Sequence, residues 1–405
     1  MLSWDFLSFL AFLGMIAVIV VIDRKKIEAH GPLFIRRTLR GRNFIVRTGE
    51  RFSRFWTWIG NLAIVAGFAA SIFLIYLLLD QVFTLLTTLQ PPQGVGFVVP
   101  APSLVIMPGV IGVPVWYWVV SIITLLVVHE GLHGIVAASQ KIKIKTLGWI
   151  FLLVLPMGAF VEPDEKDVLR KSKASQLRFF AAGSFANFLV AALVGLILLP
   201  AFTAPVLVES EGVGINLIEG YPVSQSLLLQ EMTNNFSAEQ KPYLVLRSVN
   251  GIEIVNYGDT EDAFDQVDIR PGDTISMNLD VYYGNSKENV DISVEAAESP
   301  VNSSRGYVGI SFLQGQPQVV KDELIASRTA IFFFGEMMSW IVIIHLGVGL
   351  FNMLPLGPLD GGRMYNALLE RYAPKKRKKA MKIIQGFVLL VLFIVLASAV
   401  ASNFI

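Results

Sequence analysis

The apolar stretch PVWYWVVSIITLLVVHEGLHGIVAA, residues 114 to 138, carries two histidines and a glutamate near its end, in His129-Glu130-Gly131-Leu132-His133. A stretch of this length and composition predicts a helix that crosses a membrane. Residues four apart lie on one face of a helix, so both imidazoles can reach one divalent cation while Glu130 stands beside its bound water. Ionisable side chains are costly in hydrocarbon, so the cluster indicates a functional site. The alternative is a pair of helix histidines that are hydrogen-bonded to neighbouring carbonyl groups.

Composition places the chain among polytopic membrane proteins. Hydrophobic residues make up 54% of it and charged residues only 16%, which is more apolar than a soluble core of this length needs. The chain has no cysteine. Disulfides and cysteine metal ligands are therefore excluded, and histidine and carboxylate groups remain as metal ligands.

Six hydrophobic stretches approach or exceed the roughly 20 residues that a spanning helix needs. They cover residues 5–22, 57–84, 114–138, 177–200, 329–353 and 383–402. The first has no basic region before it and no small-residue cleavage site after it, so we expect an uncleaved anchor. The sequence thus predicts about six spans.

Lysine and arginine are segregated along the chain. The segment between the first two spans is rich in them, whereas residues 80–114 have none. The positive-inside rule places this segment in the cytoplasm, together with residues 141–145, 166–173 and 375–379, and both termini outside. Basic runs beside spans indicate topology or contact with the lipid bilayer, so no nucleic-acid partner is expected.

Residues 201–327 differ from the rest of the chain in being acidic and rich in turn signals, such as Asn250-Gly251 and Pro271-Gly272-Asp273. Short runs typical of strands cover residues 243–249, 252–255, 274–282 and 289–294. We expect a small β-rich soluble domain between spans four and five, outside the cytoplasm. Its acidic surface is explained by solvation rather than by a cation site.

The segment after the histidine span predicts a re-entrant β-hairpin. Residues 141–145 alternate between lysine and isoleucine, as in a strand with one wet face. An apolar run over residues 147–161 follows, is broken by Pro156 and Gly158, and is too short for a spanning helix. Non-helical backbone at membrane depth must be buried or line a cavity, so the hairpin should cover the hydrated metal. An ordinary interfacial loop is the alternative.

Two histidines leave a catalytic metal site incomplete, because such sites usually have three protein ligands. The best candidate for the third is Asp360, within NMLPLGPLDGGR at residues 352–363. The prolines and glycines there should break the fifth span and aim the carboxylate inward. A helix-capping aspartate is the alternative.

These motifs resemble those of the site-2 protease family of intramembrane zinc metalloproteases. That family has HExxH on one span and Asn-x-x-Pro-x-x-x-Leu-Asp-Gly on a later one, and both occur here. Residues 183–188, GSFANF, resemble its glycine-and-asparagine motif, with Gly183-Ser184 where many members have Gly-Pro. The inserted domain resembles a PDZ domain, although residues 210–240 show no clear glycine-rich carboxylate-binding loop. The resemblance covers roughly residues 115–370.

The resemblance implies a fold, a site and an activity. The fold is a polytopic α-helical membrane protein with a re-entrant β-hairpin and an inserted PDZ-like domain. Zn²⁺ would be bound by His129, His133 and Asp360, with Glu130 as general base and acid. Asn187 would assist the substrate or the oxyanion, and Asn352 would assist more weakly. The activity is cleavage of peptide bonds in or near transmembrane helices of membrane-protein substrates, as in regulated intramembrane proteolysis.

The expected organisation has five parts. Residues 1–113 form a two-span region with a basic cytoplasmic loop, and residues 114–200 form the first part of the catalytic membrane core. Residues 201–327 form the extracytoplasmic PDZ-like domain, 328–370 the second part of the core, and 371–405 a basic segment with the last span. The active site should lie towards the cytoplasmic side of a cell membrane. His345, on the fifth span, is interpreted as a packed or hydrogen-bonded residue.

Two other functions remain open at the level of sequence. One is a catalytically silent membrane scaffold that acts through its PDZ-like domain. The other is a metal-ion transporter with His129, His133 and Asp360 as a transit site. Both should tolerate Glu130→Gln, whereas hydrolysis should not. The sequence indicates neither the identity of a substrate nor an oligomeric state.

Overall fold

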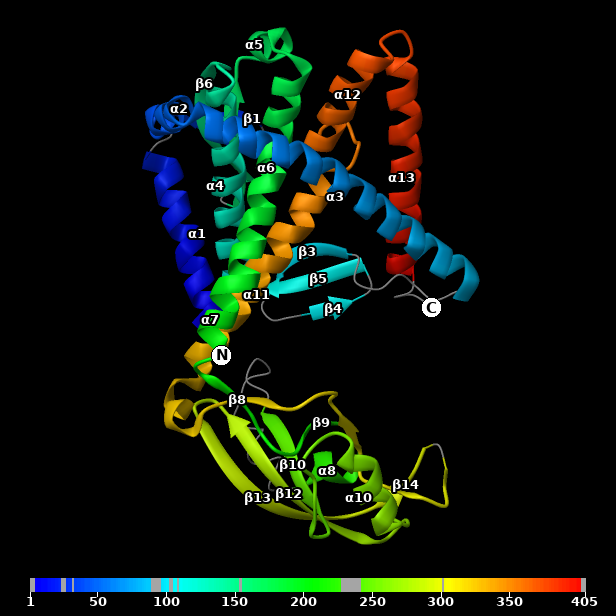
Figure 1. The fold of residues 1–405 in the computed structure, drawn as a ribbon. Coiled ribbons are helices and arrows are strands. Elements are labelled where there is room, and N and C mark those ends of the chain that lie inside the picture. The colour runs from blue at the N-terminus through cyan, green and yellow to red at the C-terminus, as the bar shows by residue number, and fades with distance from the viewer. Residues whose placement is uncertain are drawn as a thin grey trace. The chain divides into compact units, whose positions relative to one another are not determined.

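The structure is a computed structural model that describes residues 4–22, 27–30, 33–88, 96–101, 105–107, 109–152, 155–226, 242–300 and 302–401. The chain divides into two compact units (Figure 1). The membrane unit comprises Met1–Leu198 and Met337–Ile405, and the inserted unit comprises Leu199–Glu336.

Within the described residues, five stretches are long and apolar enough to cross a membrane. They are α3 (Ser53–Thr88), α4 (Val115–Ser139), Lys173–Thr203, Asp322–Asn352 and α13 (Arg377–Ala401). Lys173–Thr203 contains α6 (Lys173–Leu193), a π-helical turn (Val194–Leu198) and α7 (Leu199–Thr203), and Asp322–Asn352 contains α11 (Arg328–Asn352). The prediction of a polytopic membrane protein is confirmed.

The remaining predicted span coincides with α1 (Trp4–Ile22), a helix of 19 residues. The structure describes its side chains only in part, so the count of six spans stays a prediction.

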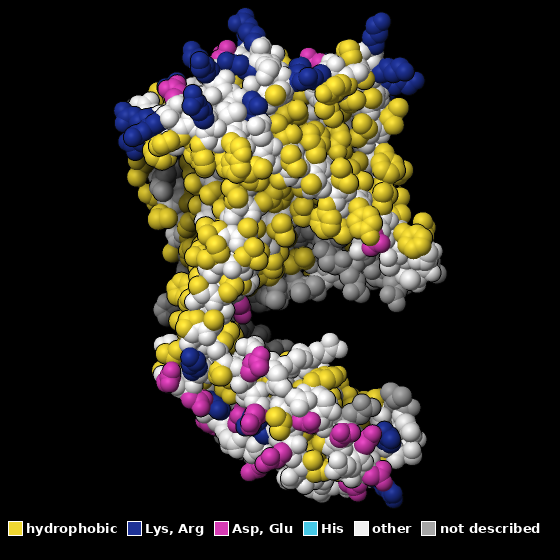
Figure 2. Space-filling view, viewed as in Figure 1, with side chains coloured by type: hydrophobic (Ala, Val, Ile, Leu, Met, Phe, Trp, Pro, Cys, Tyr) yellow, Lys and Arg dark blue, Asp and Glu magenta, His cyan; other side chains and the backbone are white. Residues whose placement is uncertain are grey.

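The outward faces of these helices are apolar. Large hydrophobic side chains of α3 and α13 are mostly exposed, for example Val65 at 69%, Phe83 at 66% and Phe393 at 69%. On the face drawn in Figure 2, a broad band of hydrophobic side chains covers the membrane unit, with lysine and arginine gathered at one end. Helices that are apolar all round are stable where lipid, rather than water, is the solvent.

Small residues let the helices around α4 approach closely. At Gly49 of α2 (Arg42–Arg51), a Cβ atom would lie 2.4 Å from the Ile135 carbonyl oxygen of α4. At Gly349 of α11, it would lie 2.7 Å from the Phe188 ring of α6. Membrane helices pack through such contacts because lipid offers no hydrophobic drive for their association.

A four-stranded antiparallel sheet lies beside α4, in the order β1 (Ile27–His30), β2 (Leu33–Thr38), β6 (Ile144–Leu152) and β7 (Leu155–Pro163). The predicted hairpin is β6 and β7, and its register shifts between Ile150 and Phe151, opposite Pro156. The strand begins at Ile144 and not at Lys141, because Lys141 turns the chain out of α4 with φ at 56°. The position of the hairpin in a membrane stays a prediction.

Within the described part of the membrane unit, two strand-forming segments are not predicted from the sequence. One is β1 and β2, which lie in the segment expected to be only a basic loop. The other is a three-stranded sheet of β3 (Gly96–Ala101), β4 (Val105–Met107) and β5 (Gly109–Pro114), before α4. A Cβ atom at Gly109 would lie 2.9 Å from Val400, so this sheet packs against the end of α13.

The inserted unit is built on a six-stranded sheet whose core includes Leu246, Leu279, Val281 and Ile292. Its path is β13 (Ser286–Glu295), β12 (Thr274–Tyr283), β10 (Tyr243–Val249), β9 (Val213–Leu217) and β16 (Ile310–Phe312), and β11 (Ile252–Glu253) pairs with β10. The described part of this unit also contains the helices α8 (Pro222–Gln225) and α10 (Asp259–Val267). Two short strand pairs lie in it as well: β14 (Ala297–Glu298) with β15 (Gly306–Tyr307), and β8 (Leu207–Glu209) with β17 (Gln318–Val320). Strands β10 to β13 coincide with the four predicted strand segments. The PDZ assignment stays a prediction.

Candidate metal centre

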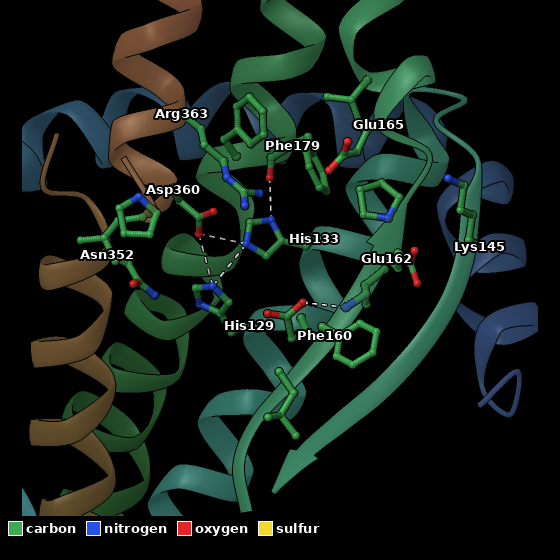
Figure 3. Close-up of a pocket in the computed structure, with 18 of the residues that line it drawn as sticks. His129, His133, Lys145, Phe160, Glu162, Glu165, Phe179, Asn352, Asp360 and Arg363 are labelled. Carbon is green, nitrogen blue, oxygen red and sulfur yellow. Dashed lines mark hydrogen bonds and ion pairs between the residues drawn. The ribbon is translucent and has the colours of Figure 1, made fainter. Parts of the chain in front are cut away.

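Three predicted ligands meet at one point in the membrane unit (Figure 3). The Nε2 atoms of His129 and His133 are 3.2 Å apart. The Oδ2 atom of Asp360 lies 3.3 Å from the first and 3.0 Å from the second. His129 and His133 stand one turn apart on α4, and Asp360 is the first residue of α12 (Asp360–Tyr372). The structure therefore brings together residues separated by up to 231 positions, from 129 to 360.

The break between α11 and α12 delivers Asp360. Helix α11 ends at Asn352, and the following Met353 and Leu354 are fully buried. The chain then turns so tightly that a Cβ atom at Gly361 would lie 2.2 Å from the Met353 carbonyl oxygen, and one at Gly362 would lie 1.9 Å from that of Leu356. Only glycine fits at these positions. No side chain caps the N-terminus of α12, so the carboxylate of Asp360 does not serve as a helix cap, which was the alternative to a metal ligand.

Helix α6 lies directly behind the two histidines. The Nδ1 atom of His133 is 2.7 Å from the Phe179 carbonyl oxygen, and the Nδ1 atom of His129 is 3.1 Å from Asn187 Nδ2. Gly183 lies between them, at a spacing of four residues on one helix face. The two contacts hold the Nδ1 side of each imidazole, so both Nε2 atoms face Asp360.

The three ligand atoms fit a metal ion. Atoms bound about 2.0–2.1 Å from a tetrahedral ion lie about 3.3–3.4 Å apart, and the three separations here are 3.0–3.3 Å. Two imidazoles and one carboxylate form a donor set of the kind found in catalytic zinc sites, with a fourth position left for water. Hydrogen bonding to neighbouring carbonyl groups explains only the Nδ1 atom of His133, not the convergence of the Nε2 atoms.

A cavity of about 1040 Å³ opens beside this metal centre. His129, Glu130, His133 and Asp360 line one part of it. The hairpin lines another part, through residues that include Phe160, Val161 and Glu162 of β7. The hairpin therefore borders the cavity that contains the metal centre, as the sequence predicts.

Glu130 is tied to the hairpin. Its Oε2 atom accepts a hydrogen bond of 2.8 Å from the backbone N–H of Val161. Because β7 is the edge strand of its sheet, this N–H is directed away from β6 and towards α4. One carboxylate oxygen is thus anchored while the side chain lines the cavity.

The two asparagines lie in different places. Asn187 is fully buried against His129 and does not line the cavity, whereas Asn352 does. His345 is fully buried on α11, with its Nδ1 atom 2.8 Å from the Ile341 carbonyl oxygen. The interpretation of His345 as a packed, hydrogen-bonded residue agrees with this contact.

Sequence reasoning assigned no role to three groups at the site. The first is the carbonyl oxygen of Phe179, a backbone group that every residue type has, so the sequence could not indicate this contact. Gly183 must be small because a Cβ atom there would lie 2.3 Å from His133 Nε2. Arg363 lines the cavity from α12, with its guanidinium 5.9 Å from the centre of the Phe180 ring. Gly183 stands in the glycine-and-asparagine motif one helical turn before Asn187, and this spacing could have indicated that it faces the histidines.

Residues 117–396 match the model of peptidase family M50. The match spans more than half of the chain and includes all three metal-centre residues. The chain belongs to peptidase family M50. This M50 peptidase is similar to an uncharacterized protein of Methanocaldococcus jannaschii, with 25% identity over 365 residues that cover 89% of this chain and 84% of that protein. The resemblance to the site-2 protease family is confirmed, and the family identifies the protein as a peptidase.

Proposed function

We propose that this M50 peptidase is a zinc-dependent intramembrane endopeptidase that cleaves peptide bonds in or near transmembrane helices of membrane-protein substrates. The observation that carries the proposal is the convergence of His129, His133 and Asp360 within a unit of apolar helices. The cavity beside these residues is large enough to hold the water that hydrolysis at membrane depth requires.

Glu130 is the general base and acid of the proposed reaction. Zinc held by His129, His133 and Asp360 would acidify water and polarise the substrate carbonyl. Glu130 takes a proton from the attacking water and returns it to the leaving amine. Its bond to Val161 fixes one carboxylate oxygen, so the other is available for these transfers.

Two side chains that line the cavity can donate hydrogen bonds to the developing oxyanion. Asn352 lies at the end of α11, and Arg363 lies on α12, one turn after Asp360. Figure 3 shows the Arg363 guanidinium directed towards the metal centre. Each such donor is typically worth about 3 kcal/mol in the transition state. Asn352 and Arg363 are better placed for this role than Asn187, which is buried behind His129.

The proposed topology has six spans and a cytoplasmic active site. Helix α5 (Glu165–Arg170) and the turn between α12 and α13 lie at one end of the membrane unit (Figure 1), the end where lysine and arginine gather (Figure 2). The positive-inside rule places this end in the cytoplasm. His129 and His133 lie in the half of α4 nearer this end. The inserted unit then lies outside the cytoplasm, as a PDZ-like filter for substrates.

The edge of β7 is the proposed binding site for an unwound substrate. A helical substrate hides its carbonyl groups in its own hydrogen bonds, so cleavage requires local unwinding. An extended segment can then add to an exposed sheet edge through backbone hydrogen bonds. On this edge of β7 the N–H of Val161 donates to Glu130, and the N–H of Ala159, two residues earlier, has the same orientation and is the proposed donor to the substrate.

Replacing Ala159 with proline tests this binding mode. Proline removes an N–H from the free edge but none from the ladder with β6, so the sheet should persist. Cleavage of a transmembrane reporter is expected to fall at least about fivefold, with metal content unchanged, because one or more backbone hydrogen bonds of about 1 kcal/mol are lost. Ala159→Ser is the matched control and should cleave like the wild type. Wild-type cleavage by Ala159→Pro would contradict the binding mode.

Cleavage of a transmembrane reporter by the purified protein in detergent tests the proposed function itself. The expected result is cleavage that depends on both metal and Glu130. A scaffold or a metal-ion transporter would show no cleavage at full metal occupancy.

A further inference from the structure

The contact behind His129 has a mismatch in its hydrogen-bonding groups. Asn187 is fully buried, and its Nδ2 atom lies 3.1 Å from His129 Nδ1. Its Oδ1 atom is also buried and has no hydrogen-bond partner within the described residues. A buried carbonyl oxygen without a partner is unfavourable by about 1–3 kcal/mol.

The chemistry of a metal-binding histidine specifies what should face Nδ1. Such a histidine binds the ion through an unprotonated nitrogen, and its other nitrogen carries a proton that needs an acceptor. The Nε2 atom of His129 faces His133 and Asp360, so Nδ1 is the protonated nitrogen. An amide NH₂ group cannot accept that proton, whereas an amide oxygen can.

Exchanging the two ends of the Asn187 amide removes the mismatch. The oxygen and nitrogen of an amide occupy nearly the same space, so their assignment depends on the hydrogen-bond network. With Oδ1 in the place of Nδ2, the Nδ1–H group of His129 donates to it over the same 3.1 Å. The buried oxygen then has its partner.

The second histidine shows the same arrangement. The Nδ1–H group of His133 donates to the Phe179 carbonyl oxygen, 2.7 Å away. Phe179 and Asn187 are two turns apart on α6, with Gly183 midway. One face of α6 therefore supplies an acceptor to each histidine, from the backbone in one case and from a side chain in the other.

We propose that Asn187 is a positioning residue that accepts the Nδ1–H of His129 through Oδ1 and so fixes the tautomer in which Nε2 faces the metal. The inference rests on the proposed metal site. It gives Asn187 a role in metal affinity rather than in contact with substrate, in agreement with its absence from the cavity lining.

Zinc affinity of two variants tests the proposal. Zinc dissociation constants are measured for the full-length protein in detergent, by competition with a chromophoric chelator. Asn187→Leu has a similar volume but no acceptor, and the expected loss is about 10–100-fold, the usual effect of removing an outer partner of a metal-binding histidine. Asn187→Asp keeps an acceptor and is expected to bind zinc within about threefold of the wild type or more tightly.

Ser184→Ala is the matched control for α6. Ser184 is fully buried, and its Oγ atom has no hydrogen-bond partner within the described residues. Its removal should leave zinc affinity unchanged. Wild-type affinity in Asn187→Leu would overturn the proposal.

The aspartate variant decides the question even if the leucine variant does not fold. If Asn187 instead donates through Nδ2 to an unprotonated Nδ1 of His129, the aspartate carboxylate would face a lone pair and repel it. Weak zinc binding by folded Asn187→Asp would therefore overturn the proposed orientation. A wild-type protein without measurable zinc affinity would overturn both this inference and the metal site. If the variants rank as expected in zinc affinity but the protein cleaves no peptide, the inference is supported. Only the proposed function is then contradicted.

Discussion

Gly183→Ala is expected to destroy the metal centre. The added Cβ atom would lie 2.3 Å from His133 Nε2 and 2.5 Å from His129 Nε2, the atoms that would bind the metal. Real Cβ atoms do not approach other heavy atoms so closely, so the imidazoles or α6 must move. Metal affinity should fall by at least about 100-fold, the upper end of the effect of disturbing the outer partners of a metal-binding histidine. Cleavage should fall with it.

Metal content after purification and zinc competition measure this effect. Gly386→Ala on α13 is the matched control, because no atom of the described residues, apart from its own stretch of helix, lies within 4 Å of its added Cβ. Alanine is favoured over glycine in a helix by about 0.5–1 kcal/mol, so this control should fold at least as well as the wild type. Wild-type zinc affinity in Gly183→Ala would show that the three residues do not hold the ion.

Glu130→Gln is expected to abolish turnover while leaving the metal in place. Glutamine has nearly the same shape, and its Oε1 atom can still accept the Val161 N–H, so the hairpin contact should survive. It cannot take a proton from water. General acid–base catalysis is typically worth about 10²–10⁴-fold, so cleavage of a transmembrane reporter should fall by that factor.

Glu165→Gln is the comparison for this variant, since Glu165 also lines the cavity but is not placed to act as the base. Its cleavage rate should stay within about twofold of the wild type, because Glu165 is exposed and its replacement should change folding stability by no more than about 0.5 kcal/mol. Equal cleavage by the wild type and Glu130→Gln at equal metal content would exclude Glu130 as the base. It would also reopen the assignment of the catalytic residues.

The ligands of the metal centre could be predicted because their chemistry is encoded locally. The spacing of four between His129 and His133 defines one helix face, and the prolines and glycines before Asp360 define the break that delivers it. Both signals need only a short window of sequence. The hairpin could be predicted for the same reason, from alternation and from a run too short to span a membrane.

The surroundings of the site could not be predicted, because they depend on contacts between distant segments. Strand β2 pairs with β6, which lies more than 100 residues later in the chain. The sequence of β2 taken alone predicts only a basic loop. The Phe179 carbonyl carries no information in its residue type. Asn187 was assigned to the oxyanion from a motif resemblance, and only the side of His129 that it contacts indicates a different role. The span over α1 and the membrane topology remain predictions.

Removal and return of the metal test the central claim most directly. The purified protein would be stripped with a chelator, and cleavage of a transmembrane reporter would be measured as zinc is added back. The account predicts no cleavage by the stripped protein and full recovery at one equivalent of zinc, with His133→Ala and Asp360→Ala failing to recover. Undiminished cleavage by metal-free protein would contradict it.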